Sequence, residues 1–332
     1  DPLPARGLFQ KHGPRFLVQN PPQPHLTSGE LDKIYALDFT RDVHPYYGAQ
    51  GRVNALETIK FSITSHRGCY GECNFCSIGV HEGRTVLSRS EQSIIDEARK
   101  LTDFSDFKGY IPDIGGATAN MYGMECRKKQ QHGVCKNKRC LYPQVCDSLH
   151  ADHSRQIHLL RNLQRIPGVK KVFVASGIRH DLLLGDKKHC AEYMRELVKN
   201  HTSGQLKVAP EHTVPDILKL MGKPQAVALL NFKRLFEKST ESSGKKLYLT
   251  YYFIAAYPGC TEEDMHRLKS FAGRELKTTP RQVQIFTPLP STYSSVMYYT
   301  GTDPFTGKKI FVEKKIDKKQ KQKNILTGGQ NR

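Results

Sequence analysis

Three cysteines lie close together in the sequence, at Cys69, Cys73 and Cys76, with the spacing Cys-x3-Cys-x2-Cys. Thiolates are the usual protein ligands of iron–sulfur clusters, and three on one loop can hold three irons of a [4Fe–4S] cube. Gly68 and Gly71 allow the backbone to curl tightly around such a cluster. The fourth iron is then left to chelate a small molecule, so the three cysteines are predicted to be metal ligands. A zinc knuckle is the alternative, although zinc normally requires a fourth ligand.

Four more cysteines follow in a basic, loop-like stretch: Cys126, Cys135, Cys140 and Cys146. Four thiols within 21 positions are enough for a second metal site, either tetrahedral zinc or a second iron–sulfur centre. The gaps between them fit no standard zinc finger, so free thiols are the alternative reading, and His132 and His150 are candidate substitute ligands. The remaining cysteines, Cys190 and Cys260, are expected to be buried and unreactive.

The elements that must position these cysteines alternate between strands and helices. Short β-rich runs are predicted at 58–64, 107–114, 170–176, 205–209, 247–255 and 282–287. Helices are predicted between them at 90–102, 152–166, 190–200, 215–221, 226–238 and 261–271. This order is typical of a parallel sheet with outer helices, and six such units fit a partial (β/α)6 barrel better than a closed eight-fold one. In barrels, the chemistry lies at the carboxyl ends of the strands.

The predicted barrel spans residues 58–300 and includes a cysteine-rich insertion, 120–150, after its second strand. Residues 1–57 are proline-rich in part and show no clear periodicity, so an extended segment that packs on the barrel is expected. Residues 301–332 are expected to form a C-terminal extension that ends in a basic tail.

The cysteine motif resembles that of the radical S-adenosylmethionine (SAM) superfamily. That signature has the same spacing, follows the first strand and carries an aromatic residue before the last cysteine, here Phe75. The resemblance implies a radical SAM enzyme whose [4Fe–4S] cluster chelates SAM, receives one electron and cleaves SAM to methionine and a 5′-deoxyadenosyl radical. That radical would remove hydrogen from a substrate at the barrel mouth. A one-electron reductant is therefore an expected partner.

Segments after the later strands extend the resemblance. Asp113-Ile114-Gly115-Gly116-Ala117-Thr118 resembles the superfamily's double-glycine motif, but lacks the acidic residue that usually follows the glycines. The third strand ends in residues 175–181, and residues 208–212 with 217–224, like residues 253–264, resemble segments of radical SAM methylthiotransferases. The resemblance thus implies a set of cofactor-binding residues: Gly115, Gly116, Thr118, Ser176, Arg179 and Glu211. It identifies no further catalytic residue.

A narrower resemblance is to the YgiQ-like (UPF0313) family of radical SAM proteins, whose substrate is unassigned. It is carried by the cysteine motif and by Val18-Gln19-Asn20-Pro21-Pro22, Asp42-Val43-His44-Pro45, Asn120-Met121-Tyr122 and Ala209-Pro210-Glu211-His212. Members of that family begin further upstream, and this chain starts at Asp1 rather than Met. We therefore expect it to be part of a longer protein.

The composition favours a folded, cytoplasmic protein with a polyanionic partner. Lys and Arg total 51 against 32 Asp and Glu, a net charge of +19, and the sequence has no apolar run long enough to span a membrane. Excess charge of this kind favours nucleic acid as a partner, although part of it lies in the C-terminal lysine run. Two alternatives therefore remain open: an RNA-modifying enzyme similar to methylthiotransferases, and a zinc-containing nucleic-acid-binding protein.

Overall fold

The computed structural model describes residues 6–21, 23–48, 50–51, 53–136 and 138–328. Its central strands run parallel and pair with their neighbours in chain order. β3 (Ile63–Thr64) pairs with β7 (Ile114–Gly115), and β6 (Tyr110–Ile111) pairs with β8 (Lys171–Val172). β9 (Gln205–Glu211), β10 (Tyr248–Ala255) and β11 (Gln282–Ile285) form a three-stranded sheet with β10 in the middle.

Single backbone contacts join these short sheets to one another. The N–H of Ile114 donates to the carbonyl of Phe173, and Ile178 forms a parallel bridge with Val208. The fold is therefore α/β with parallel strands, and the pairing among the described residues does not close into a barrel.

Helices follow the strands, and the six predicted helices are confirmed with shifts of a few residues at their ends. They are α4 (Glu91–Thr102), α6 (Ser154–Leu163), α8 (Cys190–Glu196) with its continuation η3 (Leu197–His201), α9 (Pro215–Met221), α10 (Ala226–Ser243) and α11 (Glu262–Phe271). In α4, the Ser90 hydroxyl caps the first turn, and Ile94, Ala98 and Leu101 are buried at helical spacing. Other short helical elements are η1 (Pro45–Tyr47), α3 (Ile78–His81), η2 (Ala119–Met121), α7 (His180–Gly185), η4 (Ala272–Leu276) and α12 (Tyr293–Thr300). None of the described helices has the length and apolar character needed to cross a membrane.

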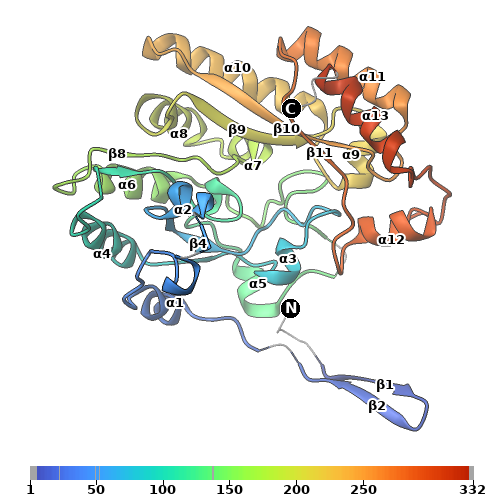
Figure 1. Cartoon of the computed structure of the whole chain (residues 1–332), viewed down its shortest axis with the longest axis horizontal. Coiled ribbons are helices and arrows are strands. Elements are labelled where there is room, and N and C mark those ends of the chain that lie inside the picture. Colours follow the sequence, from blue (N-terminus) through green and yellow to red (C-terminus); the bar gives the residue numbers. More distant parts are fainter. Residues whose placement is uncertain (1–5, 22, 49, 52, 137, 329–332) are drawn as a thin grey trace.

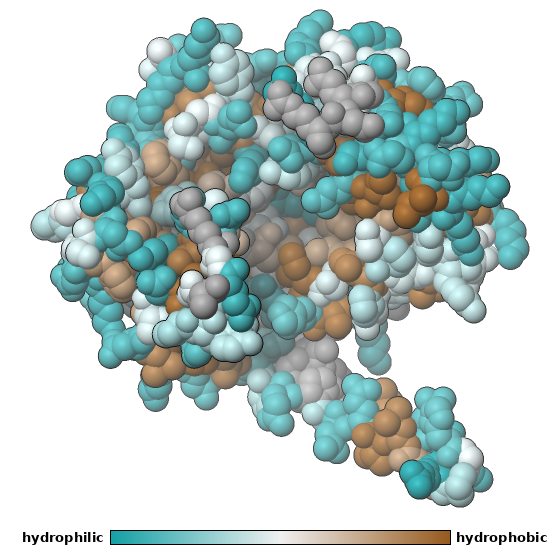
Figure 2. Space-filling view, in the orientation of Figure 1, coloured by the Kyte–Doolittle hydropathy of each residue, from teal (hydrophilic) through white to brown (hydrophobic). Residues whose placement is uncertain are grey.

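The amino-terminal region differs from the expected extended segment. β1 (Leu8–His12) and β2 (Arg15–Gln19) form an antiparallel hairpin that projects from the body of the molecule (Figure 1), and all ten residues are exposed. Hydrophobic side chains gather on this hairpin (Figure 2). α1 (Ser28–Tyr35) and α2 (Asn54–Ile59) follow, so only the end of the predicted 58–64 strand is extended. The segment 58–64 is too short for its pattern of hydrophobic residues to distinguish a strand from a helix.

The C-terminal lysine run is a helix rather than a solvated tail. α13 (Ile316–Thr327) packs beside α11, and Lys319, Gln322 and Leu326 are buried. The Gln322 side chain accepts a hydrogen bond from the Ala256 N–H (3.0 Å) and donates to the Cys260 carbonyl (3.3 Å). Ala256 has a positive φ of 56° just after β10, so the glutamine bonds a backbone N–H in a strained turn.

We predict that Gln322→Ala destabilises the fold by about 1–3 kcal/mol, because it leaves a buried N–H and a buried carbonyl without partners. Gln320→Ala is the matched control, since Gln320 bonds only to Asn324 on the same helix. Urea unfolding of both variants measures the difference. Equal midpoints for the two variants would show that the Gln322 bonds do not hold α13 in place.

Candidate functional site

The cysteine motif forms a loop that is closed by a short antiparallel pairing. β4 (His66–Arg67) pairs with β5 (Leu87–Ser88), and the loop between them is closed again by a bond from the Cys69 N–H to the Gly83 carbonyl (3.2 Å). Gly68 has a φ of 83°, and a Cβ there would lie 2.2 Å from the Thr85 carbonyl oxygen. A glycine is therefore required where the chain enters the loop.

Hydrogen-bond donors surround the sulfur atoms of this loop. The Gly71 N–H donates to Cys69 Sγ (3.3 Å), and Thr118 Oγ1 lies 3.5 Å from the same sulfur. Arg179 Nη1 donates to Cys73 Sγ at 3.2 Å. Burial raises the pKa of Cys69, and burial raises the pKa of Cys76 to about 11, so metal binding must displace protons from these thiols.

Arg179 is held in place by a series of buried polar contacts. Its Nε and Nη2 donate to the two oxygens of Asp181 at 2.6 and 3.0 Å. The Asn120 side chain accepts from the Arg179 N–H (2.8 Å) and donates to the Arg179 carbonyl (3.1 Å). Asn120 Nδ2 in turn lies 3.2 Å from Nε2 of His153, whose Nδ1 lies 2.8 Å from Asp186. Two residues absent from the predicted site, Asn120 and Asp181, thus position the arginine.

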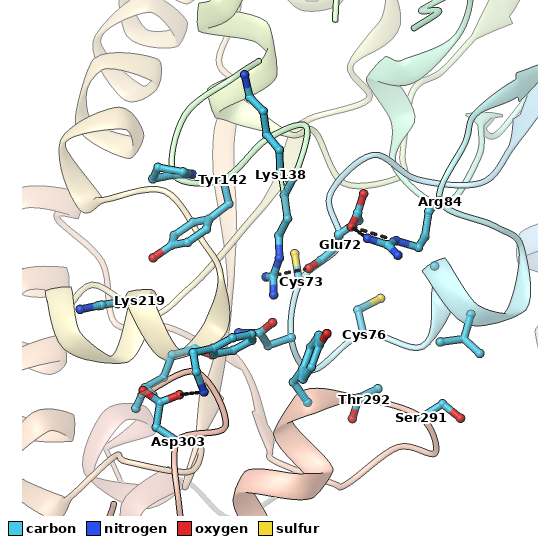
Figure 3. Close-up of a pocket in the computed structure, with 18 of the residues that line it drawn as sticks. Glu72, Cys73, Cys76, Arg84, Lys138, Tyr142, Lys219, Ser291, Thr292 and Asp303 are labelled. Carbon is cyan, nitrogen blue, oxygen red and sulfur yellow. Dashed lines mark hydrogen bonds and ion pairs between the residues drawn. The ribbon is translucent and has the colours of Figure 1, made fainter. Parts of the chain in front are cut away.

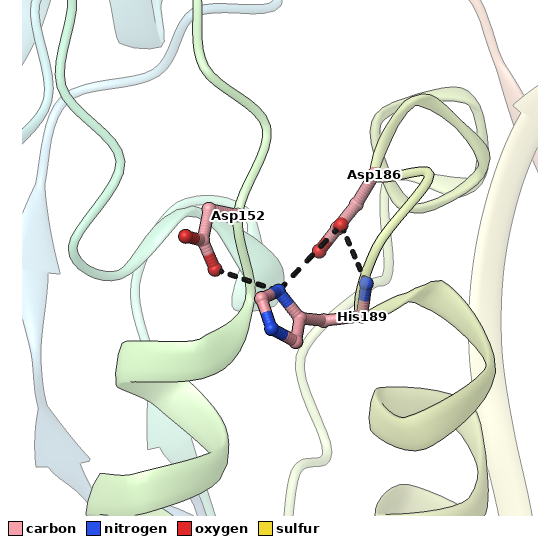
Figure 4. Close-up of side chains that lie close together, drawn as sticks. All are labelled: Asp152, Asp186 and His189. Carbon is pink, nitrogen blue, oxygen red and sulfur yellow. Dashed lines mark hydrogen bonds and ion pairs between the residues drawn. The ribbon is translucent and has the colours of Figure 1, made fainter.

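Asp186 also belongs to a group that resembles a metal site. Among the described residues, one group of at least three His, Cys, Asp or Glu side chains has ligand atoms within 4.8 Å of one another, namely Asp152, Asp186 and His189 (Figure 4). Both Asp186 oxygens are already engaged: Oδ1 accepts from the backbone N–H groups of Lys188 and His189, and Oδ2 accepts from that of His153. The carboxylate therefore holds the turn that precedes α8 (Cys190–Glu196) and orients His153.

A carboxylate inside the cysteine motif connects the loop to the cysteine-rich insertion. Glu72, which has a φ of 46°, pairs with Arg84 and with Lys129 Nζ (3.0 Å) from α5 (Arg127–His132). The Lys129 side chain is fully buried and also donates to the Arg84 carbonyl (2.6 Å). Sequence reasoning missed both Glu72 and Lys129. The one feature of the sequence that pointed to Glu72 was its position, as a charged residue between Cys69 and Cys73.

The predicted cofactor residues lie around the carboxyl ends of the parallel strands. Gly115 and Gly116 line a cavity of about 210 Å³ together with Ser176, Asp113 and His66. The Ser176 hydroxyl, however, donates to Asp113, so its oxygen is already part of a strand-to-strand contact. Gly116 packs against His66 so closely that a Cβ would lie 2.6 Å from the His66 carbonyl oxygen.

Glu211 lies at the end of β9 on the same side as Arg179. It has a φ of 69°, and burial raises the pKa of its carboxyl group although Lys223 and Arg179 oppose the shift. Lys223 itself is buried and donates to the Ala209 carbonyl at 2.6 Å. The structure thus brings Thr118 and Arg179 to the cysteine sulfurs and sets Glu211 in the electrostatic field of Arg179 and Lys223.

The second group of cysteines is only partly brought together. Cys126 and Cys140 are buried in an apolar cluster with Tyr70 and Leu141, and Cys146 packs at its edge. Within the described part of the chain, no three of the four sulfurs of Cys126, Cys135, Cys140 and Cys146 lie within 4.8 Å of one another. The possible second metal site at these four cysteines stays a prediction.

The two glycines of the 115–116 pair allow a matched test of the site's packing. We predict that Gly116→Ala lowers the stability by about 1–3 kcal/mol, because the new Cβ would overlap the His66 backbone. In Gly115→Ala the nearest atom, Ala119 Cα, is 3.4 Å away, so a much smaller change is expected. Thermal unfolding of the two variants makes the comparison. Equal losses would show that β4 and the loop after β7 are not packed as described.

The chain resembles known proteins over most of its length. A family model described as Radical SAM N-terminal matches residues 1–62. A UPF0313 protein from Fusobacterium nucleatum is 54% identical over 98% of this chain, and one from Thermotoga petrophila is 48% identical over 98%. Among solved structures, the radical S-adenosylmethionine methyltransferase TsrM from Kitasatospora setae, with cobalamin and a [4Fe–4S] cluster bound, aligns with a TM-score of 0.47 and 15% identity over 74% of this chain and 41% of that chain.

The curated relatives are longer than this chain, which spans 58% of the Fusobacterium protein and 57% of the Thermotoga protein. The matched region nevertheless covers 98% of this chain, and its overall identity is near one half. The chain therefore belongs to the UPF0313 family, within the radical SAM superfamily.

Proposed function

We propose that this chain is the catalytic core of a radical SAM enzyme, with a [4Fe–4S] cluster at Cys69, Cys73 and Cys76. The observation that carries the proposal is the convergence of groups from separate strands on the sulfurs of one loop. Thr118 comes from the segment after β7, and Arg179 from the segment after β8. When bound, such a cluster supplies one electron for reductive cleavage of SAM.

The donor set fits a cluster better than a single ion. The three sulfurs are not within 4.8 Å of one another, as ligands of one zinc ion would be, whereas thiolates on three different irons lie further apart. Donors to the sulfurs, such as Arg179 and the Gly71 N–H, stabilise thiolate charge and tune the potential of an iron–sulfur centre. The donor set leaves one iron open to a small molecule.

Residues beside the loop suit the charged groups of SAM. Gly115 and Gly116 let the backbone after β7 approach a ligand closely, and Thr118 lies next to Cys69. Glu211 offers a carboxylate for a cationic group of SAM, whereas Arg179 contributes its charge beside the loop while its guanidinium is bonded to Asp181 and Cys73. Ser176 contributes by fixing Asp113, since its hydroxyl is already committed.

The parallel strand segments support a partial (β/α)6 barrel as the scaffold for this chemistry. Each of the six segments pairs with, or bridges to, its neighbour in chain order. A one-electron reductant completes the proposed activity. The proposal does not extend to a second metal at Cys126, Cys135, Cys140 and Cys146, because the apolar cluster accounts for the burial of two of them.

The cluster assignment is tested by replacing cysteines in the full-length protein, reconstituted anaerobically. We predict that Cys69→Ala, Cys73→Ala and Cys76→Ala each lose most of the bound iron and all detectable 5′-deoxyadenosine formation, because two thiolates hold a cube poorly. Cys190→Ala is the matched control, since Cys190 is a half-buried thiol outside the loop, on α8. Iron and sulfide analysis with chromatography of the SAM products gives the result. Full cleavage activity in any of the three loop variants would move the cluster elsewhere.

A further inference from the structure

A cavity of about 740 Å³ adjoins the cysteine loop and is not explained by the proposed cofactor residues (Figure 3). Cys73 and Cys76 line it on one side. Its other walls come from the insertion, from α9 and from the segments on either side of α12, and they include Lys138, Tyr142, Lys219, Tyr293 and Phe305. None of the residues implied in SAM binding lies in this wall, among those that the structure describes.

The wall of this cavity is cationic. It carries five basic side chains: Arg84, Lys136, Lys138, Arg139 and Lys219. Its two carboxylates are already engaged, Glu72 by Arg84 and Lys129, and Asp303 by the Phe305 N–H and the Thr306 hydroxyl. Arg84 is paired with Glu72 and Lys138 contacts the Cys146 thiol, but the exposed Lys136 and Lys219 remain to attract a negatively charged ligand. SAM, which carries a net positive charge, does not suit this wall.

Aromatic rings are held at the same wall by Arg139. Its guanidinium lies 5.4 to 5.9 Å from the ring centroids of Tyr142, Tyr293 and Phe305. Arg139 also donates to the Glu72 carbonyl (3.2 Å), which ties the rings to the cysteine loop. Tyr293 and Phe305 lie against each other, with ring centroids 4.8 Å apart, and each is about half exposed, at 51% and 53%, so part of each ring remains accessible to a planar ligand.

A buried acceptor completes the set. Asn74 lines the cavity, is only 3% exposed, and donates through Nδ2 to the Leu220 carbonyl (2.7 Å). Its Oδ1 has no hydrogen-bond partner within the described structure. Buried polar atoms are almost always paired, so this oxygen is suited to receive an N–H from a ligand.

From these features we infer that the cavity binds a nucleotide: lysines for the phosphate, ring faces for the base, and Asn74 Oδ1 for an N–H of the base edge. Positive grooves with stacking rings are the usual means of binding single nucleotides along a strand. Because Cys73 and Cys76 form part of the wall, the nucleotide is the substrate of the radical chemistry, a role that rests on the proposed function. A free nucleotide and a nucleotide within single-stranded RNA present the same chemistry.

Binding to the full-length, cluster-reconstituted protein tests the inference. Equilibrium dialysis is performed with saturating SAM, so that the cofactor site is occupied, and with four probes: uridine 5′-monophosphate, uridine, inorganic phosphate and a short single-stranded oligouridylate. We expect the monophosphate or the oligonucleotide to bind at least about tenfold more tightly than uridine or phosphate alone. Uridine lacks the phosphate that would make charge-assisted contacts with the lysines, and inorganic phosphate lacks a base that would stack on the rings. Much tighter binding of the oligonucleotide identifies RNA as the source, and equal binding identifies a free nucleotide.

The variant Lys136→Ala/Lys219→Ala is expected to weaken binding of the more tightly bound probe by about tenfold or more. The control variant Lys171→Ala/Lys187→Ala removes two exposed lysines outside the cavity and should have no effect. Circular dichroism and SAM cleavage are measured on both variants. No binding of either nucleotide probe, or wild-type affinity in the cavity variant, would overturn the inference. Either result leaves the cluster assignment intact, because 5′-deoxyadenosine formation reports on it separately.

Discussion

The candidate site depends on the contacts of one buried cation, the guanidinium group of Arg179. A cation removed from water costs several kcal/mol unless it is paired, and Asp181 supplies the pairing with both carboxylate oxygens. That pairing leaves Nη1 to donate to Cys73 Sγ. Because Asn120 clamps both backbone groups of Arg179, and Asn120 contacts His153, the position of one sulfur depends on residues that reach back to the start of α8.

The cysteine-rich insertion is ordered by the same kind of constraint. The Lys129 and Glu72 side chains are both buried, so removing Glu72 leaves the Lys129 charge unpaired beside the cysteine loop, whereas Glu72 keeps Arg84 as a second partner. Cys126 and Cys140 add apolar contacts with Tyr70, which belongs to the loop itself. Packing and one buried ion pair thus account for the placement of the insertion beside the loop. Cys126 and Cys140 contribute to this packing as small hydrophobic residues.

Patterns local in sequence predicted the elements and the cysteine motif, whereas contacts between distant segments could not be predicted. Periodicity located the helices because each buries one face against the strands, as α4 does through Ile94, Ala98 and Leu101. The helix α13 was missed because its lysines suggested a solvated tail, while Gln322 binds backbone groups 62 and 66 residues away. Arg139 was missed for the same reason, since two of its three rings lie more than 150 positions further along the chain.

The two cavities beside the cysteine loop differ in charge, and this difference bears on how cofactor and substrate would share one cluster. The smaller cavity contains Asp113 and Glu82 against Arg67, and His66 adds no charge at neutral pH because burial lowers its pKa to about 4. The larger cavity is cationic. On the proposed function, a positively charged SAM and an anionic substrate would therefore approach the loop through different walls, without competing for the same side chains. The cysteine loop, whose sulfurs contact Thr118 on one side and line the larger cavity on the other, would then be the meeting point of the two ligands.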